Sequence, residues 1–166
     1  NALTWELVAD NIFGEIIYAL EINQNGHIYV GTYAGVHISK DNGETWETKT
    51  ADMTNTKIRS LFFTSTGAIF AGVFSDKGYR SLDNGETWEP FSYNGLRSIF
   101  CYTENIEGHI YVGCNGRGIL RTLDGGTTWE DCDNELPTHY VDAILAHPNG
   151  HIYAGTRGHG VYRSYE

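Results

Sequence analysis

Short runs of β-branched and aromatic residues, bounded by glycine, recur along the whole chain. The run has the form Gly-x-Ile-aromatic-x-Gly, and it occurs four times, at residues 26–31, 67–72, 108–113 and 150–155. Runs of this length and composition predict β-strands. An apolar run precedes each one, at residues 16–22, 58–63, 96–102 and 140–146. A shorter apolar run follows each one, and no segment has a convincing helical period, so we predict an all-β protein.

A polar phrase follows the third predicted strand of each repeat and ends on a tryptophan. It reads Ser-Lys-Asp-Asn-Gly-Glu-Thr-Trp at residues 39–46, and close variants occupy residues 81–88 and 122–129. Asn-Gly and Gly-Gly supply residues that tolerate the positive φ of tight hairpin turns. The aspartate can accept hydrogen bonds from backbone N–H groups just ahead of it. The phrase therefore predicts a hairpin turn, followed by a fourth strand that begins at the tryptophan.

The four tryptophans set the period of the repeat. Trp5, Trp46, Trp88 and Trp129 are 41, 42 and 41 residues apart, and the step from Trp129 around to Trp5 is again 42. Four strands in a repeat of about 40 residues predict one blade of a β-propeller. The fourth copy of the polar phrase is split between residues 164–166 and 1–5.

We therefore predict a single all-β domain over residues 1–166. It is a β-propeller with four four-stranded antiparallel blades, and the N-terminal strand at residues 3–7 completes the C-terminal blade. Such pairing would remove two exposed sheet edges. The predicted blades span residues 10–50, 51–92, 93–133 and 134–166 plus 1–9. Two alternatives stay open: two chains that exchange N-terminal strands to form an eight-bladed ring, and an excerpt of a longer propeller.

The polar phrase Ser-x-Asp-x-Gly-x-Thr-Trp resembles the Asp-box, or BNR repeat, of sialidases and many other secreted propellers. The resemblance implies a peripheral turn between the third and fourth strands, away from the end of the propeller that binds ligands. It also implies an extracellular or periplasmic protein. The residues to which it assigns a structural role are Ser39, Asp41, Gly43, Trp46, Ser81, Asp83, Gly85, Trp88, Asp124, Gly126 and Trp129, with Ser164 and Trp5 in the split copy.

Composition excludes several kinds of partner. The net charge is −10 and no basic stripe is present, which argues against nucleic acid and against an anionic membrane. Three cysteines without a Cys-x-x-Cys pair predict buried thiols rather than a disulfide framework. His27, His109 and His151 occupy the same position in three separate repeats, so they cannot converge on one ion. We expect no metal and no cofactor.

Candidate binding residues come from positions where the aligned repeats differ in chemistry. Near the start of the innermost strand these are Tyr18, Arg59, Arg97 and Asp142. The loops from the second strand to the third, which should reach the same end, contribute Tyr33, Phe74, Arg117, Arg157 and His159, and the loops between repeats add Phe13, Tyr93 and His139. Arginine presents a planar fork to carboxylates, and aromatic rings with polar neighbours suit a sugar or a peptide. Alternatively, Arg59, Arg97 and Asp142 pair with one another and close the channel.

These features favour a non-catalytic binding propeller, with a glycan or a protein as its ligand, over an enzyme. The chain lacks the Arg-Ile-Pro signature of sialidases, and carboxylates on the predicted inner strands are scarce. A retaining glycosidase needs two carboxyl groups about 5 Å apart. We therefore assign no catalytic residue. The alternatives are a sialidase-like glycoside hydrolase, or a fragment of one, and a structural half of an eight-bladed propeller; the chain would be a monomer or a strand-exchanged homodimer.

Overall fold

The computed structural model describes residues 3–9, 16–75, 77–94 and 96–165, and all the regular structure in these residues is β-strand. The first blade contains β1 (Ile17–Ile22), β2 (Ile28–Thr32), β3 (Gly35–Ser39) and β4 (Glu47–Thr48). The second contains β5 (Ile58–Phe63), β6 (Ile69–Val73), β7 (Gly78–Ser81) and β8 (Glu89–Phe91). The third contains β9 (Ile99–Glu104), β10 (Ile110–Cys114), β11 (Gly118–Thr122) and β12 (Glu130–Asp131). The fourth contains β13 (Val141–Ala146), β14 (Ile152–Thr156) and β15 (Gly160–Arg163).

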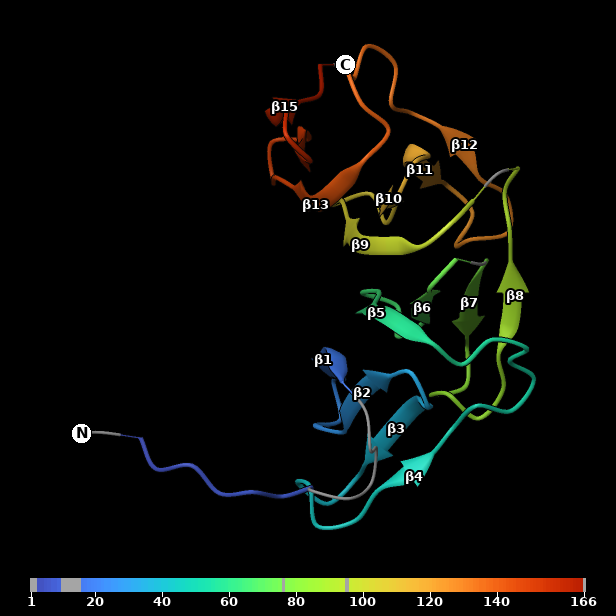
Figure 1. Ribbon diagram of the computed structural model, residues 1–166, viewed down its shortest axis with the longest axis vertical. Coiled ribbons are helices and arrows are strands. Elements are labelled where there is room, and N and C mark those ends of the chain that lie inside the picture. Colours follow the sequence, from blue (N-terminus) through green and yellow to red (C-terminus); the bar gives the residue numbers. More distant parts are fainter. Residues whose placement is uncertain (1–2, 10–15, 76, 95, 166) are drawn as a thin grey trace.

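Each blade is an antiparallel meander in which neighbouring strands in the sequence pair with each other. The blades stand side by side, with β1, β5, β9 and β13 as their inner strands and β4, β8 and β12 at the periphery (Figure 1). The inner strands pack in chain order, β1 on β5, β5 on β9 and β9 on β13. This arrangement confirms the predicted all-β propeller fold.

The hydrophobic core lies in three layers, one between each pair of neighbouring blades. The first layer joins Tyr29 and Ile38 of the first blade to Ile58, Tyr79 and Trp88 of the second, and all five are almost fully buried. Burying an aliphatic side chain such as Ile58 contributes about 1.5–3 kcal/mol. The alternation of strand residues between two sheet faces lets each blade supply one face to the blade before it and the other to the blade after it.

The polar phrase forms the predicted turn between the third and fourth strands. In the second blade, Ser81 Oγ donates to Asp83 Oδ1 at 2.8 Å and accepts the Gly85 amide at 2.8 Å. Thr87 donates to the same aspartate through its hydroxyl, at 2.6 Å to Oδ2, and through its amide, at 2.9 Å to Oδ1. Asn84 and Gly85 have φ values of 59° and 87°, as predicted for this dipeptide. The first and third blades repeat this pattern around Asp41 and Asp124.

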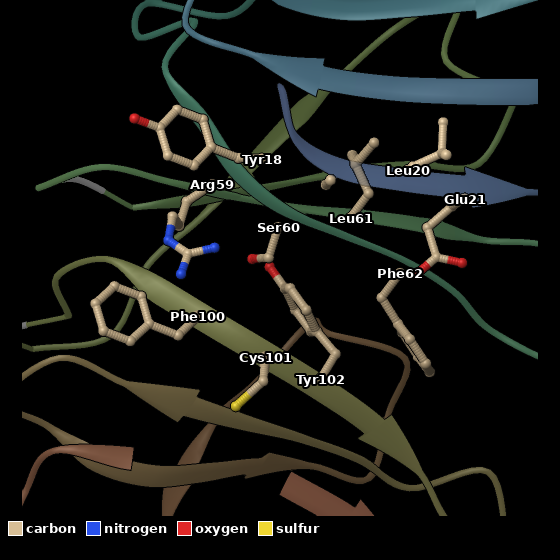
Figure 2. A pocket seen from close by; sticks show the side chains of 11 residues that line it. Tyr18, Leu20, Glu21, Arg59, Ser60, Leu61, Phe62, Phe100, Cys101 and Tyr102 are labelled. Atoms are coloured by element: carbon tan, nitrogen blue, oxygen red, sulfur yellow. The ribbon is translucent and has the colours of Figure 1, made fainter. Parts of the chain in front are cut away.

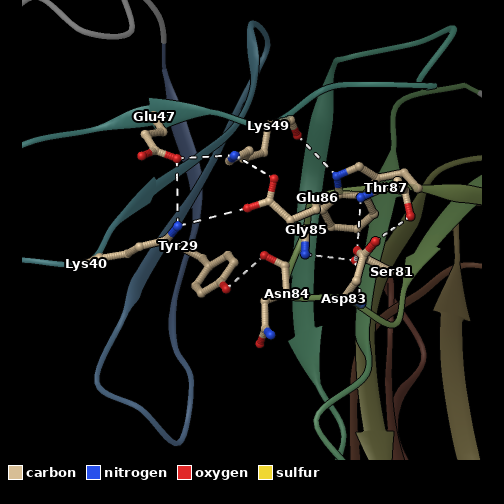
Figure 3. Close-up of polar contacts among 11 residues, drawn as sticks. Tyr29, Lys40, Glu47, Lys49, Ser81, Asp83, Asn84, Gly85, Glu86 and Thr87 are labelled. Carbon is tan, nitrogen blue, oxygen red and sulfur yellow. Dashed lines mark hydrogen bonds and ion pairs between the residues drawn. The ribbon is translucent and has the colours of Figure 1, made fainter.

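The turns of the second and third blades also contact the preceding blade, and Figure 3 shows the second. Tyr29 of the first blade donates its hydroxyl to the Asn84 carbonyl at 3.1 Å, and Lys49 contacts Glu86 at 2.7 Å. Trp88 is 2% exposed and donates its indole N–H to the Lys49 carbonyl at 3.1 Å. The turn therefore locks its own hairpin and ties two blades together, which is a structural role.

The predicted closure by the N-terminal strand is not formed in this structure. The fourth sheet has three strands, residues 3–9 form no strand, and Trp5 is 91% exposed. The four blades form an open fan with β1 and β13 at its two ends (Figure 1). The N-terminal segment lies at the β1 end, so it does not reach the fourth blade. The split copy of the turn is therefore not assembled; Ser164 Oγ instead accepts the Ile152 amide at 2.8 Å. Three further residues of the split copy, Glu166, Asn1 and Ala2, lie outside the described residues.

Candidate functional site

A β-bulge interrupts the inner strand of every blade at the same position. In the first blade, Ile17 pairs with Thr32 and Ala19 with Gly31, so Tyr18 is the extra residue of the bulge. The same irregularity lies at Arg59 in β5 and at Asp142 in β13. A bulge leaves one residue out of the ladder and re-aims its side chain, and such bulges are common beside binding sites.

The structure corrects the position that we assigned to the third blade. In β9 the extra residue is Phe100, because Ile99 pairs with Cys114 and Cys101 pairs with Gly113. Arg97 lies ahead of this strand and is exposed. The corrected set is Tyr18, Arg59, Phe100 and Asp142. Each of these residues is eight positions before the first glycine of its Gly-x-Ile-aromatic-x-Gly run, and that count in the sequence would have identified Phe100.

Three aromatic rings form a cluster at the first two blades. Tyr18 stacks on Tyr33 from the β2–β3 loop, with centroids 4.9 Å apart and planes inclined by 20°. Phe74, from the β6–β7 loop, packs edge-on against both rings at 5.2 and 5.0 Å. Edge-to-face and offset arrangements at these distances are favourable. Sequence reasoning identified all three residues, and the structure brings them together.

Arg59 extends this cluster toward the third blade. Its guanidinium carbon is 5.7 Å from the Tyr18 ring centroid and 5.0 Å from that of Phe100. Figure 2 shows the guanidinium between the two rings. Cations at such distances from aromatic faces are attracted to the π-electrons. Arg59 therefore links the first blade to the third across the inner strand of the second.

Arg157 and Asp142 continue the row in the fourth blade. Arg157 donates from Nη2 to Asp142 Oδ1 at 2.6 Å and from Nε to Oδ2 at 3.1 Å, a bidentate pair. Asp142 raises the pKa of Arg157, so this guanidinium stays charged. It also lies 5.5 Å from the Phe100 ring centroid and 5.7 Å from that of Tyr140. Asp142 therefore pairs with Arg157, and not with Arg59 or Arg97 as the closed-channel alternative required.

We call this continuous row of side chains the mouth band. Its members come from all four blades and combine aromatic rings with charged groups. They are Tyr18, Tyr33, Phe74, Arg59, Phe100, Arg157, Asp142 and Tyr140.

The other candidates lie apart from this row. Arg117 contacts Asp131 at 2.7 Å and lies 5.2 Å from the Tyr93 ring centroid, in a separate cluster of the third blade. His159 makes a hydrogen bond with the Arg157 carbonyl at 3.0 Å, and His139 contacts Asp133 at 2.8 Å. Phe13 lies outside the described residues.

A cavity of about 340 Å³ runs along the inner strands below the band. Its wall includes Tyr18, Arg59 and Phe100 at one end and Glu21, Cys101 and Tyr102 further along (Figure 2). Burial raises the pKa of Glu21 and raises the pKa of the Cys101 thiol to about 12. A thiol with so high a pKa is not a nucleophile at neutral pH. Cys101, Cys114 and Cys132 are all free thiols.

Two further findings concern metal binding and membrane crossing in the described residues. Within them, no three His, Cys, Asp or Glu side chains group closely enough to hold a metal. Nor do the described ranges contain a helix with the length and apolar character that spanning a bilayer requires. The described members of the mouth band comprise five aromatic rings, two guanidinium groups and one carboxylate.

Comparison with known proteins agrees with the turn geometry. A model of the BNR/Asp-box repeat matches residues 37–48 and 79–90, which hold the turns of the first two blades. The chain therefore carries BNR/Asp-box repeats on a β-propeller fold.

Two curated relatives share part of the sequence. A xyloglucanase of Hypocrea jecorina is 31% identical over 115 residues, which cover 61% of this chain and 14% of that protein. An oligoxyloglucan-reducing end-specific xyloglucanase of Emericella nidulans is 35% identical over 66 residues, covering 37% of this chain and 8% of that one. The chain thus spans a small fraction of the length of the curated relatives that it matches.

Solved structures share the fold at low sequence identity. The extracellular domain of the putative one component system BT4673 from B. thetaiotaomicron has a TM-score of 0.75 and 19% identity, over 94% of this chain and 22% of that chain. An ancestral GH74 enzyme has a TM-score of 0.72 and 20% identity, over 92% and 22%. The computationally designed Ika4 protein has a TM-score of 0.72 and 16% identity, over 98% and 99%. These likenesses concern the fold alone.

Proposed function

We propose that the chain is a non-catalytic propeller module that binds carbohydrate at the mouth band. The observation that carries this proposal is the row of aromatic rings with Arg59 between Tyr18 and Phe100. Ligand sites are typically lined by aromatic and apolar groups with a few placed polar groups. A sugar presents apolar C–H faces together with hydroxyl groups, so it suits aromatic rings with guanidinium donors beside them.

The curated relatives support a polysaccharide as the ligand class. Both are named xyloglucanases, and a solved structure of similar fold is a GH74 enzyme. Three of the solved structures with similar fold are extracellular domains of bacterial proteins. We extend the proposal to an extracellular location, where such ligands occur.

The single carboxylate among the described members of the band favours binding over hydrolysis. Retaining glycosidases use two carboxyl groups about 5–5.5 Å apart, and inverting ones use two about 6.5–9.5 Å apart. Among the described members of the band Asp142 is the one carboxylate, and Arg157 holds both of its oxygens. A carboxylate engaged in this way positions a cation and does not act as a general acid.

Titration calorimetry after a glycan-array screen tests the proposal. We expect saturable binding to a plant-type β-glucan oligosaccharide such as a xyloglucan fragment. Arg59→Ala and Tyr18→Ala should each weaken it at least about tenfold, which is 1.4 kcal/mol. Arg97→Ala is the matched control, because Arg97 is an exposed arginine outside the band; it should bind as the unchanged chain does.

Three outcomes would contradict the proposal. If no glycan bound, we would conclude that the band binds a peptide or a protein instead, and a peptide array would test this. Equal loss in Arg97→Ala and Arg59→Ala would move the site away from the band. Release of reducing sugar that is abolished by Asp142→Asn would make the chain a hydrolase.

A further inference from the structure

Among the described residues no strand pairs with the outer edge of β15, whereas β4, β8 and β12 pair with the third strands of the other blades. The outer face of this blade is uncovered as well. Val36 and Ile119, in the third strands of the first and third blades, pack against the next blade and are 0% and 6% exposed. Val161 occupies the same register position in β15, opposite Gly155, and is 74% exposed. An uncovered edge strand with apolar side chains is a template for pairing with another strand.

A segment that fits this edge is present at the start of the chain. Residues 4–6 read Thr-Trp-Glu, and so do residues 45–47, 87–89 and 128–130 at the beginning of the other fourth strands. Trp88 and Trp129 are 2% and 8% exposed, whereas Trp5 is 91% exposed. Leu3 and Leu7 beside it are 80% and 75% exposed. The chain therefore holds a fourth-strand sequence that has no sheet in this structure.

Charge complementarity links this segment to β15. In the second blade Arg80 lies opposite Glu89 and forms an ion pair with it at 2.9 Å. In the third blade Arg121 lies opposite Glu130 and forms the equivalent pair. Arg163 is the corresponding residue of β15, because it lies opposite Tyr153 as Arg121 lies opposite Tyr111. Glu6, the residue after Trp5, corresponds to Glu89 and Glu130.

The two end faces of the fan match each other in the same way. Ile17 and Leu20 on the first blade are 53% and 67% exposed. Their equivalents Ile58 and Leu61 pack against the preceding blade and are 0% and 6% exposed. Each end therefore exposes the half of a blade interface that the other end lacks.

The segment cannot reach β15 of its own chain without closing the fan. It lies at the first blade, where a Cβ built on Gly43 would come within 3.2 Å of the Val8 Cβ. β15 lies at the opposite end (Figure 1). In a second copy placed end to end, however, the first blade would follow the fourth blade directly, and its leading segment would lie beside the free edge.

We propose that two copies of this chain associate end to end into an eight-bladed ring, in which residues 3–7 of each copy complete the fourth blade of the other. The symmetry is two-fold, so both junctions form with the same contacts. The mouth band then becomes continuous around the axis, since Asp142 and Arg157 of one copy lie next to Tyr18 of the other. This inference does not depend on the nature of the ligand.

A cysteine cross-link distinguishes exchange between chains from closure within one chain. Directly opposite residues in an antiparallel pair have Cβ atoms about 4.5–5.5 Å apart, close to what a disulfide needs. The variant Glu6→Cys with Arg163→Cys should oxidise to a covalent dimer with twice the mass of the 18.5-kDa chain. The same oxidation of the unchanged chain, whose three cysteines are free, is the control and should leave it unlinked. An internal disulfide in a single chain, a ladder of higher oligomers, or no link would each overturn the proposal.

The solution mass of charge variants provides a second test. By light scattering the unchanged chain should be a dimer. Glu6→Arg should raise the dissociation constant at least about tenfold, and adding Arg163→Glu should recover a large part of that loss. The control Ile106→Arg alters a residue that is 78% exposed in the β9–β10 turn, and it should remain dimeric. Circular dichroism of each variant distinguishes dissociation from unfolding. We expect the variants to stay folded, because Glu6 and Arg163 are both exposed. A monomeric unchanged chain, or equal dissociation of Ile106→Arg, would contradict the ring.

Discussion

The Asp-box turns and the mouth band occupy different parts of the same blades and repeat in opposite ways. The three assembled turns keep nearly the same side chains and the same hydrogen bonds; the threonine hydroxyl lies 2.6 Å from the aspartate in each of them. The four bulges keep the same backbone irregularity but hold tyrosine, arginine, phenylalanine and aspartate. The side chains that repeat from blade to blade are therefore those that hold the blades together. The positions where the backbone repeats but the side chain differs are those where we expect a ligand.

The largest expected effect on stability is at a tryptophan of the turn region. Trp88→Ala removes a ring that is 2% exposed and packs between the first two blades. The loss should be about 3–5 kcal/mol of unfolding free energy, measured by urea denaturation. Leu82→Ala is the control from the same turn, because Leu82 is 66% exposed; it should change stability by less than about 0.5 kcal/mol. A loss below about 1 kcal/mol for Trp88→Ala would contradict the structural role of the turn.

A smaller effect, which depends on pH, is expected at the aspartates of the turns. Hydrogen bonds from Thr87 and Ser81 lower the pKa of Asp83 to about 2, and the equivalent bonds lower that of Asp124 to about 2. Since these values are below the usual 3.8, the carboxylates stabilise the fold above about pH 3.8, and this stability is lost as the pH falls toward 2.

Asp83→Asn tests that assignment. At pH 6 it should lower the unfolding free energy by about 0.5–1.5 kcal/mol, near the low end because the group is exposed. Its melting temperature should then fall less between pH 4 and pH 2 than that of the unchanged chain. Asp52→Asn, at an exposed aspartate outside the turns, is the control and should keep the full acid dependence. Parallel pH profiles for Asp83→Asn and the unchanged chain would show that Asp83 is not the titrating group.

The smallest expected effect on stability is at the mouth band. Arg59→Ala should change the unfolding free energy by about 0.5 kcal/mol or less, and so should Arg97→Ala, because Arg59 packs against ring faces at the mouth of the channel and is not part of the three core layers. Thermal melts of Arg59→Ala and Arg97→Ala, compared with the melt of Trp88→Ala, measure these changes in stability. If Arg59→Ala lowered the unfolding free energy nearly as much as Trp88→Ala, the mouth band would have a structural role in holding the inner strands together. The proposed difference between the two regions would then be wrong.

The sequence predicts the turns better than the mouth because the two depend on different kinds of information. A turn is a local structure, and the residues that fix it, such as Ser81, Asp83 and Gly85, lie within five positions of one another. The fold follows from the repetition of such turns at a constant period. The inner strands carry no comparable phrase, so aligning their apolar runs places Arg97 opposite Arg59, three residues too early. Counting back from the following Gly-x-Ile-aromatic-x-Gly run gives Phe100, and the register of β9 confirms it.

Partner choice at the mouth could not be predicted either. Asp142 pairs with Arg157, which is fifteen residues away and comes from the β14–β15 loop. Tyr33 and Phe74 meet Tyr18 because the loops of two blades converge at one end. Closure of the fan could not be predicted for a similar reason. It depends on how neighbouring sheets pack against each other, and the sequence of a single repeat does not specify that packing.

The bulge common to the four inner strands has a consequence for how such a protein can acquire a new specificity. Since the extra residue of each bulge makes no demand on the pairing around it, it can be exchanged for another type without rebuilding the sheet. The four positions can therefore differ in side-chain chemistry on a backbone that stays the same. A small library randomised at Tyr18, Arg59, Phe100 and Asp142 would sample many binding surfaces while leaving the Asp-box turns, and with them the folding of the chain, untouched.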